Sequence, residues 1–316
     1  MKLDCVLTAV NENPLYLEFI PIFIKTWNKL YPSVDVKIVL IAKAIPEEYK
    51  QYERHIILFE PVENVLTSFT SQFIRLLYPC ILDYKNAVLI TDMDILPTNT
   101  TYYTEHIKEY DNRKFIYYRG DHCFIYKSIA MCYNAATPEI WKDIFDVHSV
   151  EDIRYMIADV SRNNVIEEGI GKQGWFIDQL YLYEKVMTWQ KKTNNLVCLD
   201  EEKTKFNRLS RDTFRMTAEL RDAIAAGHFV DYHCHRPMSE YTELNNFIYE
   251  LLPNGKWNRF FLFPICWVFA HLVDYERDFI QYLCGFGGSK YLRIGSKHFK
   301  HVFYNFSEHI IDILGD

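Results

Sequence analysis

Two aspartates, Asp92 and Asp94, stand one residue apart directly after a run of apolar residues from Ala87 to Ile90. The apolar run is typical of a buried strand, and Pro97 is expected to end any strand pairing that follows. Because side chains alternate along extended backbone, we expect the two carboxylates to point the same way and Met93 to point into the protein. Hard oxygen ligands at a strand end suit a divalent cation that holds a phosphate. The alternative is a surface turn with two solvated aspartates.

A second stretch that resembles a site, from His228 to Pro237, lies late in the chain. If it is extended, His233 and His235 share one face and Cys234 points to the other. Adjacent positions of a strand cannot all converge on one tetrahedral ion, which argues against a structural zinc site here. The alternative for either histidine is a partly buried, hydrogen-bonded side chain.

The elements that must position these residues alternate between strands and helices. We expect the following strands: 5–10, 36–41, 56–59, 87–90, 115–118 and 124–126. We expect the following helices: 15–30 (with a kink or late start at Pro21), 68–78, 138–147, 151–164 and 175–189. Strands that alternate with helices indicate an α/β domain with a largely parallel sheet. Ligands of such sheets bind beyond the carboxyl ends of the strands.

Composition limits the classes of protein that the chain can represent. Its 316 residues are 49% hydrophobic, which indicates a folded protein with a substantial core. The 35 basic and 42 acidic residues give a net charge of −7, which argues against nucleic acid as a partner. The eight cysteines form no CxxC pair, and the first apolar run is too short for a signal peptide. We therefore expect a cytoplasmic protein.

A change in composition divides the chain into two expected parts. Residues 1–245 are expected to form the catalytic domain, and aromatic and apolar residues crowd 246–316. We expect that second part to be a helical C-terminal extension. Its apolar run at 260–273 is short and contains Pro264, so it does not predict a spanning helix. A packed helix is the main expectation for this run, and a peripheral membrane contact is the alternative.

The chain resembles glycosyltransferases of the GT-A type, in particular the glycogenin and lipopolysaccharide galactosyltransferase-like group, and also the sugar transferases of large DNA viruses. The motifs that carry the resemblance occur in the family's order within residues 3–240, and they are Ser71–Pro79, Asp92–Asp94, Tyr133–Ala136, Trp175–Gln179 and His233–Pro237. The resemblance implies a GT-A fold, which is a Rossmann-like mixed, mostly parallel sheet flanked by helices.

The resemblance also implies a metal site. A divalent ion, Mn²⁺ or alternatively Mg²⁺, would neutralise the diphosphate leaving group of a nucleotide-sugar donor. Asp94 would bind the ion most directly, and Asp92 would bind the ion or reach the ribose hydroxyls. A late histidine would complete the ligands. His233 is our choice, because Arg236–Pro237 matches the family's His…Lys-Pro ending. The stretch before Pro237 is shorter than the family's and lacks its glycine, so His235 stays the alternative.

The remaining site residues are assigned by the same resemblance. Arg75 would contact the donor's phosphates or sugar, because a planar guanidinium can bridge two oxygens. Asp178 would contact the donor sugar and is the candidate general base, which makes Asp178 and Asp94 the expected catalytic residues. Gln179 and Asn134 would line the sugar or acceptor pocket. The end of the first strand would cradle the base and ribose through Thr8, Ala9, Val10 and Asn11.

The function expected from these residues is metal-dependent transfer of a sugar from a nucleotide-diphosphate donor, first of all a UDP-sugar, to an acceptor hydroxyl. The acceptor class (glycan, lipid-linked or protein) and the stereochemistry (retaining or inverting) stay open. One alternative is a sugar-phosphate nucleotidyltransferase, although no Gly-rich basic loop follows the first strand. The other is a non-catalytic nucleotide-sugar-binding protein on the same fold.

Overall fold

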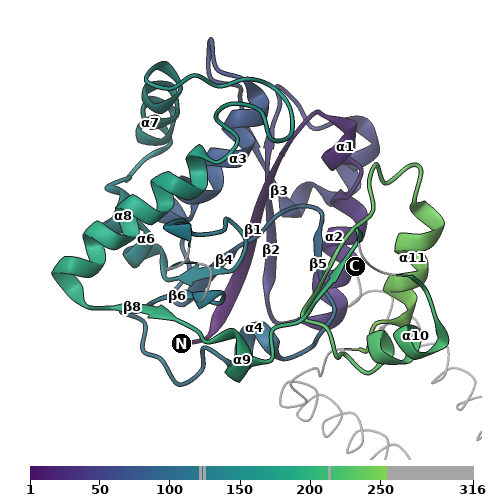
Figure 1. Ribbon diagram of the computed structural model, residues 1–316. Coiled ribbons are helices and arrows are strands. Elements are labelled where there is room, and N and C mark those ends of the chain that lie inside the picture. The colour runs from purple at the N-terminus through teal and green to yellow at the C-terminus, as the bar shows by residue number, and fades with distance from the viewer. Residues whose placement is uncertain (121–122, 124–125, 213–214, 255–316) are drawn as a thin grey trace, which may run out of the picture. The chain divides into compact units, whose positions relative to one another are not determined.

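A seven-stranded sheet with the order β3-β2-β1-β4-β7-β6-β8 forms the centre of the computed structural model, which describes residues 1–120, 123, 126–212 and 215–254 (Figure 1). Its strands are β1 (Leu3–Asn11), β2 (Asp35–Ile41), β3 (Ile56–Phe59), β4 (Ala87–Ile90), β6 (Phe115–Tyr117), β7 (Asn134–Ala136) and β8 (Leu196–Cys198). In the described sheet β7 runs antiparallel to both of its neighbours, and the other pairs are parallel. The expected α/β class with a mixed, mostly parallel sheet is confirmed.

Helices cover both faces of this sheet. Its central strands are therefore buried along their length. The helices are α1 (Pro14–Leu17), α2 (Ile20–Leu30), α3 (Thr67–Leu77), α4 (Tyr102–Glu105), α6 (Pro138–Phe145), α7 (Val150–Arg162), α8 (Ile177–Thr193), α9 (Glu201–Thr204), α10 (Ala218–Ala225) and α11 (Thr242–Leu251). Figure 1 shows α3, α6, α7 and α8 on one side of the sheet and α1 and α2 on the other. Pro21 stands in the first turn of α2, so the helix expected from residue 15 starts late.

A second sheet of three short strands, which the sequence did not predict, completes the architecture. It has the order β5-β10-β9 and comprises β5 (Ile95–Pro97), β9 (Arg208–Ser210) and β10 (Asp231–His233). Pro97, which was expected to end strand pairing, is the last residue of β5 and lies opposite Asp231. Proline is tolerated in such a short strand because it lacks only its own N–H donor. The pairing of Ile95 with His233 brings the late histidine stretch to the end of the aspartate turn.

The part of the chain around the expected domain boundary is helical. α11 runs across position 246, and Lys29 Nζ in α2 donates to the Tyr249 carbonyl at 3.0 Å. The expected helical extension beyond residue 254, its expected membrane contact and most of the strand expected at 124–126 lie outside the described residues. Within the described ranges, no helix has both the length and the apolar character that a membrane span needs.

Candidate functional site

Asp92 and Asp94 occupy a turn between β4 and β5. The backbone N–H of Thr91 donates to the Leu7 carbonyl at 3.0 Å, and that of Ile95 donates to the Asp92 carbonyl at 3.2 Å. The expectation of an extended segment with both carboxylates on one face is therefore wrong. The Asp92 side chain is 33% exposed, whereas that of Asp94 is only 5% exposed. Met93 is buried, as expected.

Arg75, in the last turn of α3, is the partner of Asp92. Its Nη1 donates to Asp92 Oδ1 and to the Thr91 carbonyl, and its Nε donates to the Gln72 carbonyl at 3.2 Å. Its Nη2 lies 3.6 Å from Asp178 Oδ2. Burial disfavours the guanidinium charge, but the two carboxylates outweigh that effect and raise the pKa of Arg75. One buried cation thus connects the aspartate turn with α8.

Asp178 stands in the first turn of α8 and is almost fully buried. Its Oδ1 accepts a hydrogen bond from the Gln179 backbone N–H at 2.8 Å. Burial raises the pKa of Asp178 to about 7, although the positive charge of Arg75 opposes this shift. A carboxylate with a pKa near neutrality can accept a proton at physiological pH, which is what a general base must do.

Asp94 faces a different set of partners. Its Oδ2 lies 2.9 Å from Arg211 Nη1, 3.1 Å from Arg236 Nη1 and 3.4 Å from His233 Nε2. Burial alone would raise the pKa of Asp94, but the hydrogen bond and charge of His233 and the two guanidinium groups hold this pKa well below its usual range. Asp94 is therefore a carboxylate that its surroundings keep ionised.

The two histidines lie in different environments because β10 ends at His233. His235 Nδ1 lies 2.6 Å from the Tyr232 hydroxyl, which donates to Asn245 Oδ1 at 2.8 Å. The Asn245 amide in turn donates to the His235 carbonyl at 3.0 Å. The two imidazoles therefore do not share one strand face, and it is His233 that the structure brings to Asp94.

Asn134 begins β7 and lies opposite Ile90 of β4, beside the start of the aspartate turn. Its Nδ2 donates to the carbonyls of Ala130 and Met131 at 2.7 and 3.1 Å. Its Oδ1 is buried and has no hydrogen-bond partner within the described part of the chain. A buried amide oxygen without a partner carries the full cost of its desolvation. Gln179 is half-buried beside Asp178.

The segment at the end of β1 that was predicted to bind the nucleotide is mostly buried. Thr8, Ala9 and Val10 are buried, so they can line a ligand site mainly through their backbone. Asn11 Nδ2 donates to Thr67 Oγ1 at 3.1 Å, which ties the end of β1 to the start of α3. Its Oδ1 accepts from the backbone N–H of Asn13 at 3.3 Å.

A buried network around Asp231 supports the site and was missed in the sequence. Asp231 is fully buried, and its carboxylate accepts from Arg208 Nε at 2.9 Å, from the Tyr103 hydroxyl at 3.4 Å and from the Tyr133 hydroxyl. Tyr133 has a φ of 87°, which is unusual for a bulky residue. This strained residue immediately precedes Asn134, so the network holds the backbone that presents Asn134.

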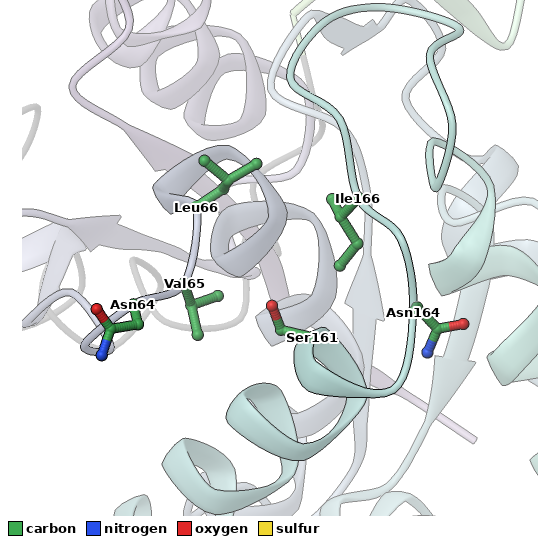
Figure 2. Close-up of a pocket in the computed structure, with 6 residues that line it drawn as sticks. All are labelled: Asn64, Val65, Leu66, Ser161, Asn164 and Ile166. Carbon is green, nitrogen blue, oxygen red and sulfur yellow. The ribbon is translucent and has the colours of Figure 1, made fainter.

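A cavity of about 400 Å³ opens beside the start of α3. Its lining comes from the loop before α3, from the end of α7 and from the segment after it, and consists of Asn64, Val65, Leu66, Ser161, Asn164 and Ile166. Figure 2 shows Val65 and Ile166 on opposite sides of the space. Among the described residues, no titratable side chain lines this cavity, so these residues supply no acid–base group there.

The expected divalent metal site is not assembled as the side chains lie. Asp92 and Asp94 have the right chemistry for Mn²⁺ or Mg²⁺, but the first is held by Arg75 and the second by Arg211 and Arg236. Within the residues that the structure describes, no group of three or more His, Cys, Asp and Glu side chains could hold a metal ion. The present arrangement therefore does not fit a divalent ion.

Comparison with solved structures finds glycosyltransferases, the class that the sequence motifs resemble. The galactosyltransferase LgtC, in complex with donor and acceptor sugar analogs, is 12% identical over 81% of this chain and 98% of its own, with a TM-score of 0.44. The glycosyltransferase GlyE of Streptococcus pneumoniae TIGR4 is 19% identical over 65% of this chain, with a TM-score of 0.39. The match spans only 47% of the GlyE chain.

A third match is a glycosyltransferase involved in the glycosylation of the major capsid of PBCV-1, which is 12% identical over 77% of this chain and 98% of its own, with a TM-score of 0.38. No protein-family model and no curated protein matches the chain. Because these TM-scores lie below 0.5, the function proposed below is supported by the side chains of the site itself.

Proposed function

We propose that the protein is a glycosyltransferase that moves a sugar from a nucleoside-diphosphate donor to an acceptor hydroxyl. The observation that supports the proposal is the uneven distribution of charged side chains in the site. Around Arg75, two carboxylates (Asp92 and Asp178) face one guanidinium. Around Asp94, two guanidiniums (Arg211 and Arg236) face one carboxylate. The half around Asp94 thus carries an excess of positive charge, and the half around Arg75 carries an excess of negative charge once Asp178 is ionised.

This polarity suits a donor that is anionic at one end and rich in hydroxyl groups at the other. The diphosphate would lie at the positive half, because guanidinium groups bind phosphate oxygens in a bidentate manner. The sugar and the acceptor hydroxyl would lie at the negative half, where Asp92 and Asp178 accept hydrogen bonds. Both halves lie beyond the carboxyl end of β4, where ligands of open α/β sheets bind.

The proposed reaction assigns one role to Asp178. The acceptor oxygen forms a bond to the anomeric carbon, while the bond from that carbon to the phosphate oxygen breaks and its electron pair leaves with the diphosphate. The proton of the acceptor hydroxyl passes to the Asp178 carboxylate, whose pKa of about 7 allows it to take up a proton at neutral pH. Asn134 would hold a sugar hydroxyl through its buried Oδ1.

The finer parts of the proposal follow from the sequence motifs. UDP-sugars are the first donor class to test, with GDP- and dTDP-sugars next. The motifs also imply Mn²⁺ or Mg²⁺ as a cofactor, and binding of either ion would require Asp92 or Asp94 to exchange an arginine for the ion. The acceptor is proposed to be a glycan, a lipid-linked glycan or a protein, and the location to be the cytoplasm.

Calorimetry with UDP, GDP and dTDP, each in Mn²⁺ and in EDTA, tests the donor site. We expect one nucleoside diphosphate to bind in at least one of the two conditions. Incubation with the matching nucleotide-sugar should then release that diphosphate, and faster release with an added glycan acceptor would identify transfer. If no nucleoside diphosphate binds in either condition, the proposed function is wrong.

Analysis of the reaction products separates the two rival functions. A nucleotidyltransferase would release pyrophosphate from UTP and a sugar 1-phosphate, which a glycosyltransferase does not. A non-catalytic binding protein would bind the nucleotide-sugar and leave it intact even with acceptor present. Either result would replace the proposed reaction while leaving the nucleotide site in place.

A further inference from the structure

Two arginines from separate segments meet at one carboxylate oxygen. Arg211 follows β9 and Arg236 follows β10. Their Nη1 atoms lie 2.9 and 3.1 Å from Asp94 Oδ2, respectively. Each arginine side chain is 15% exposed, so the guanidinium groups are partly covered yet remain reachable from solvent. No sequence motif pointed to Arg211.

Both guanidinium groups are held in place by further contacts. Arg211 Nη1 also donates to the Cys234 carbonyl at 2.8 Å. Arg236 Nη1 also donates to the Tyr16 hydroxyl, and its guanidinium lies 5.0 Å from the centre of the Tyr16 ring. These contacts restrict the two side chains before any ligand arrives, which lowers the entropy that ligand binding must remove.

The printed contacts of both arginines use only Nη1. In the part of the chain that the structure describes, Nε and Nη2 of Arg211 and Arg236 have no hydrogen-bond partner. An arginine carries five N–H donors in a planar fork that matches phosphate oxygens. With respect to the described residues, the pair therefore has several unused donors, and it brings a net positive charge beside the end of β4.

The same pair explains why Asp94 does not form part of a metal site. A divalent ion at Asp94 Oδ2 would have to displace both guanidinium groups or lie beside them, and like charges at that separation repel. The arginines already supply the positive charge that a metal ion would bring to a diphosphate. Asp94 then holds the guanidinium groups of Arg211 and Arg236 in position.

We propose that Arg211 and Arg236 bind the donor diphosphate directly, with Asp94 as the positioning residue that holds them, so that the nucleotide binds without a divalent ion. This inference rests on the proposed function, because it takes a nucleoside diphosphate as the ligand. It assigns to Arg211 a binding role, and it changes the role expected for Asp94 from metal ligand to support for the arginine pair.

Calorimetry with UDP in EDTA tests the arginine pair, with GDP and dTDP as further probes. We expect the wild type to bind in EDTA within about tenfold of its affinity in Mn²⁺, and Arg211→Ala to bind at least about tenfold more weakly, because a hydrogen-bonded charge is lost. Arg221→Ala is the matched control, since it removes the same charge from a side chain of α10 that is 54% exposed. Its affinity should equal that of the wild type.

A second variant separates the two roles of Asp94. Asp94→Asn keeps a side-chain oxygen that can accept hydrogen bonds from the two arginines and so hold them in place. It removes the negative charge that competes with the diphosphate for them. We expect UDP binding in EDTA to be as tight as in the wild type or tighter. A metal-ligand role predicts the opposite, which is loss of Mn²⁺-dependent binding in Asp94→Asn. Circular dichroism checks that each variant is folded, and Arg211→Lys repeats the test with the charge kept and the planar fork removed.

The possible failures are distinguishable. If UDP binds the wild type in Mn²⁺ but not in EDTA, or if Arg211→Ala binds as tightly as the wild type, this inference is wrong and the proposed donor site stands. The inference is equally contradicted if Asp94→Asn is folded and loses UDP binding in EDTA. If none of the three diphosphates binds in either condition, the proposed function itself is wrong, and this inference falls with it.

Discussion

Arg75 Nη2 lies 3.6 Å from Asp178 Oδ2, and the two side chains are 8% and 5% exposed. The guanidinium comes from the last turn of α3 and the carboxylate from the first turn of α8, so this contact joins two helices that flank the sheet. The same guanidinium holds Asp92. A substitution at any one of these three residues should therefore alter the interactions of the other two.

Asp178→Asn should separate chemistry from binding. If Asp178 accepts the acceptor's proton, its loss should lower the rate of transfer by about 10²- to 10⁴-fold. The amide remains near Arg75, so the affinity for the nucleoside diphosphate should change little. Single-turnover transfer and calorimetry on the same preparation measure the two quantities. A variant that transfers sugar at the wild-type rate would remove Asp178 from the reaction.

The rate of transfer should depend on pH through Asp178. Its pKa is raised to about 7 by burial, against the opposing charge of Arg75, so the base form becomes populated only as the pH rises towards 7. Below that pH the rate should fall about tenfold per pH unit, because only the ionised fraction can accept the proton. A profile of kcat/KM against pH checks this, and a rate that is flat from pH 5 to pH 8 would contradict it.

The same raised pKa makes stability depend on pH with the opposite trend. Folded Asp178 keeps its proton up to about pH 7, whereas the unfolded chain loses it near the ordinary value of 3.8. Between these values the folded state binds more protons, so the free energy of unfolding falls as the pH rises. Urea titrations of the wild type and Asp178→Asn at pH 5 and pH 8 should show a smaller fall in the variant.

Arg75→Ala should destabilise the fold strongly. Removal of Arg75 leaves the carboxylates of Asp92 and Asp178 without their shared cation, and breaking a buried ion pair in this way costs about 3–5 kcal/mol. Urea unfolding measures the change. Arg113→Ala is the control, because Arg113 pairs with Asp111 at the surface and is 79% exposed. Equal stability of the two variants would show that the Arg75 contacts contribute nothing.

Two glycines in the loop before α8 make a matched pair of variants. Gly174 and Gly171 both have positive φ, at 88° and 72°. A Cβ at Gly174 would lie 2.9 Å from the Val165 carbonyl oxygen, whereas a Cβ at Gly171 would meet nothing within 4 Å. Gly174→Ala should therefore lower the melting temperature more than Gly171→Ala. Because Gly174 shortly precedes Asp178, its variant should also slow transfer. Equal effects in both variants would exclude a role for the clash.

Sequence patterns predicted the central sheet well, for a physical reason. The ranges expected for β3 and β4, 56–59 and 87–90, are the bounds that the structure has. β4 is a continuous apolar run because both faces of this central strand are buried. β3 is equally apolar, although it lies at the edge of the sheet and leaves Leu58 42% exposed. By contrast, no strand was expected at β7, because Asn134, Ala135 and Ala136 carry no apolar alternation.

The arrangement of the site could be predicted only in part. Asp92, Asp94, Arg75 and Asp178 were selected from the sequence, and the structure brings them into one region. Which cation faces which carboxylate was not predictable, because that depends on how the three-residue strands β5, β9 and β10 pair. Their partners lie far apart in the chain, and no local periodicity encodes such a pairing.

The position of β10 between β5 and β9 sets the order in which this centre can form as the chain is synthesised. β1, β2 and β4 precede residue 91, so they can pair early. The partners of Asp94 emerge only with Arg211 and Arg236, and β5 gains its neighbour only when β10 has been made. Contacts of such long sequence separation form late. A chain that ends before β10 would therefore lack the charge pattern of the site even if its main sheet were in place.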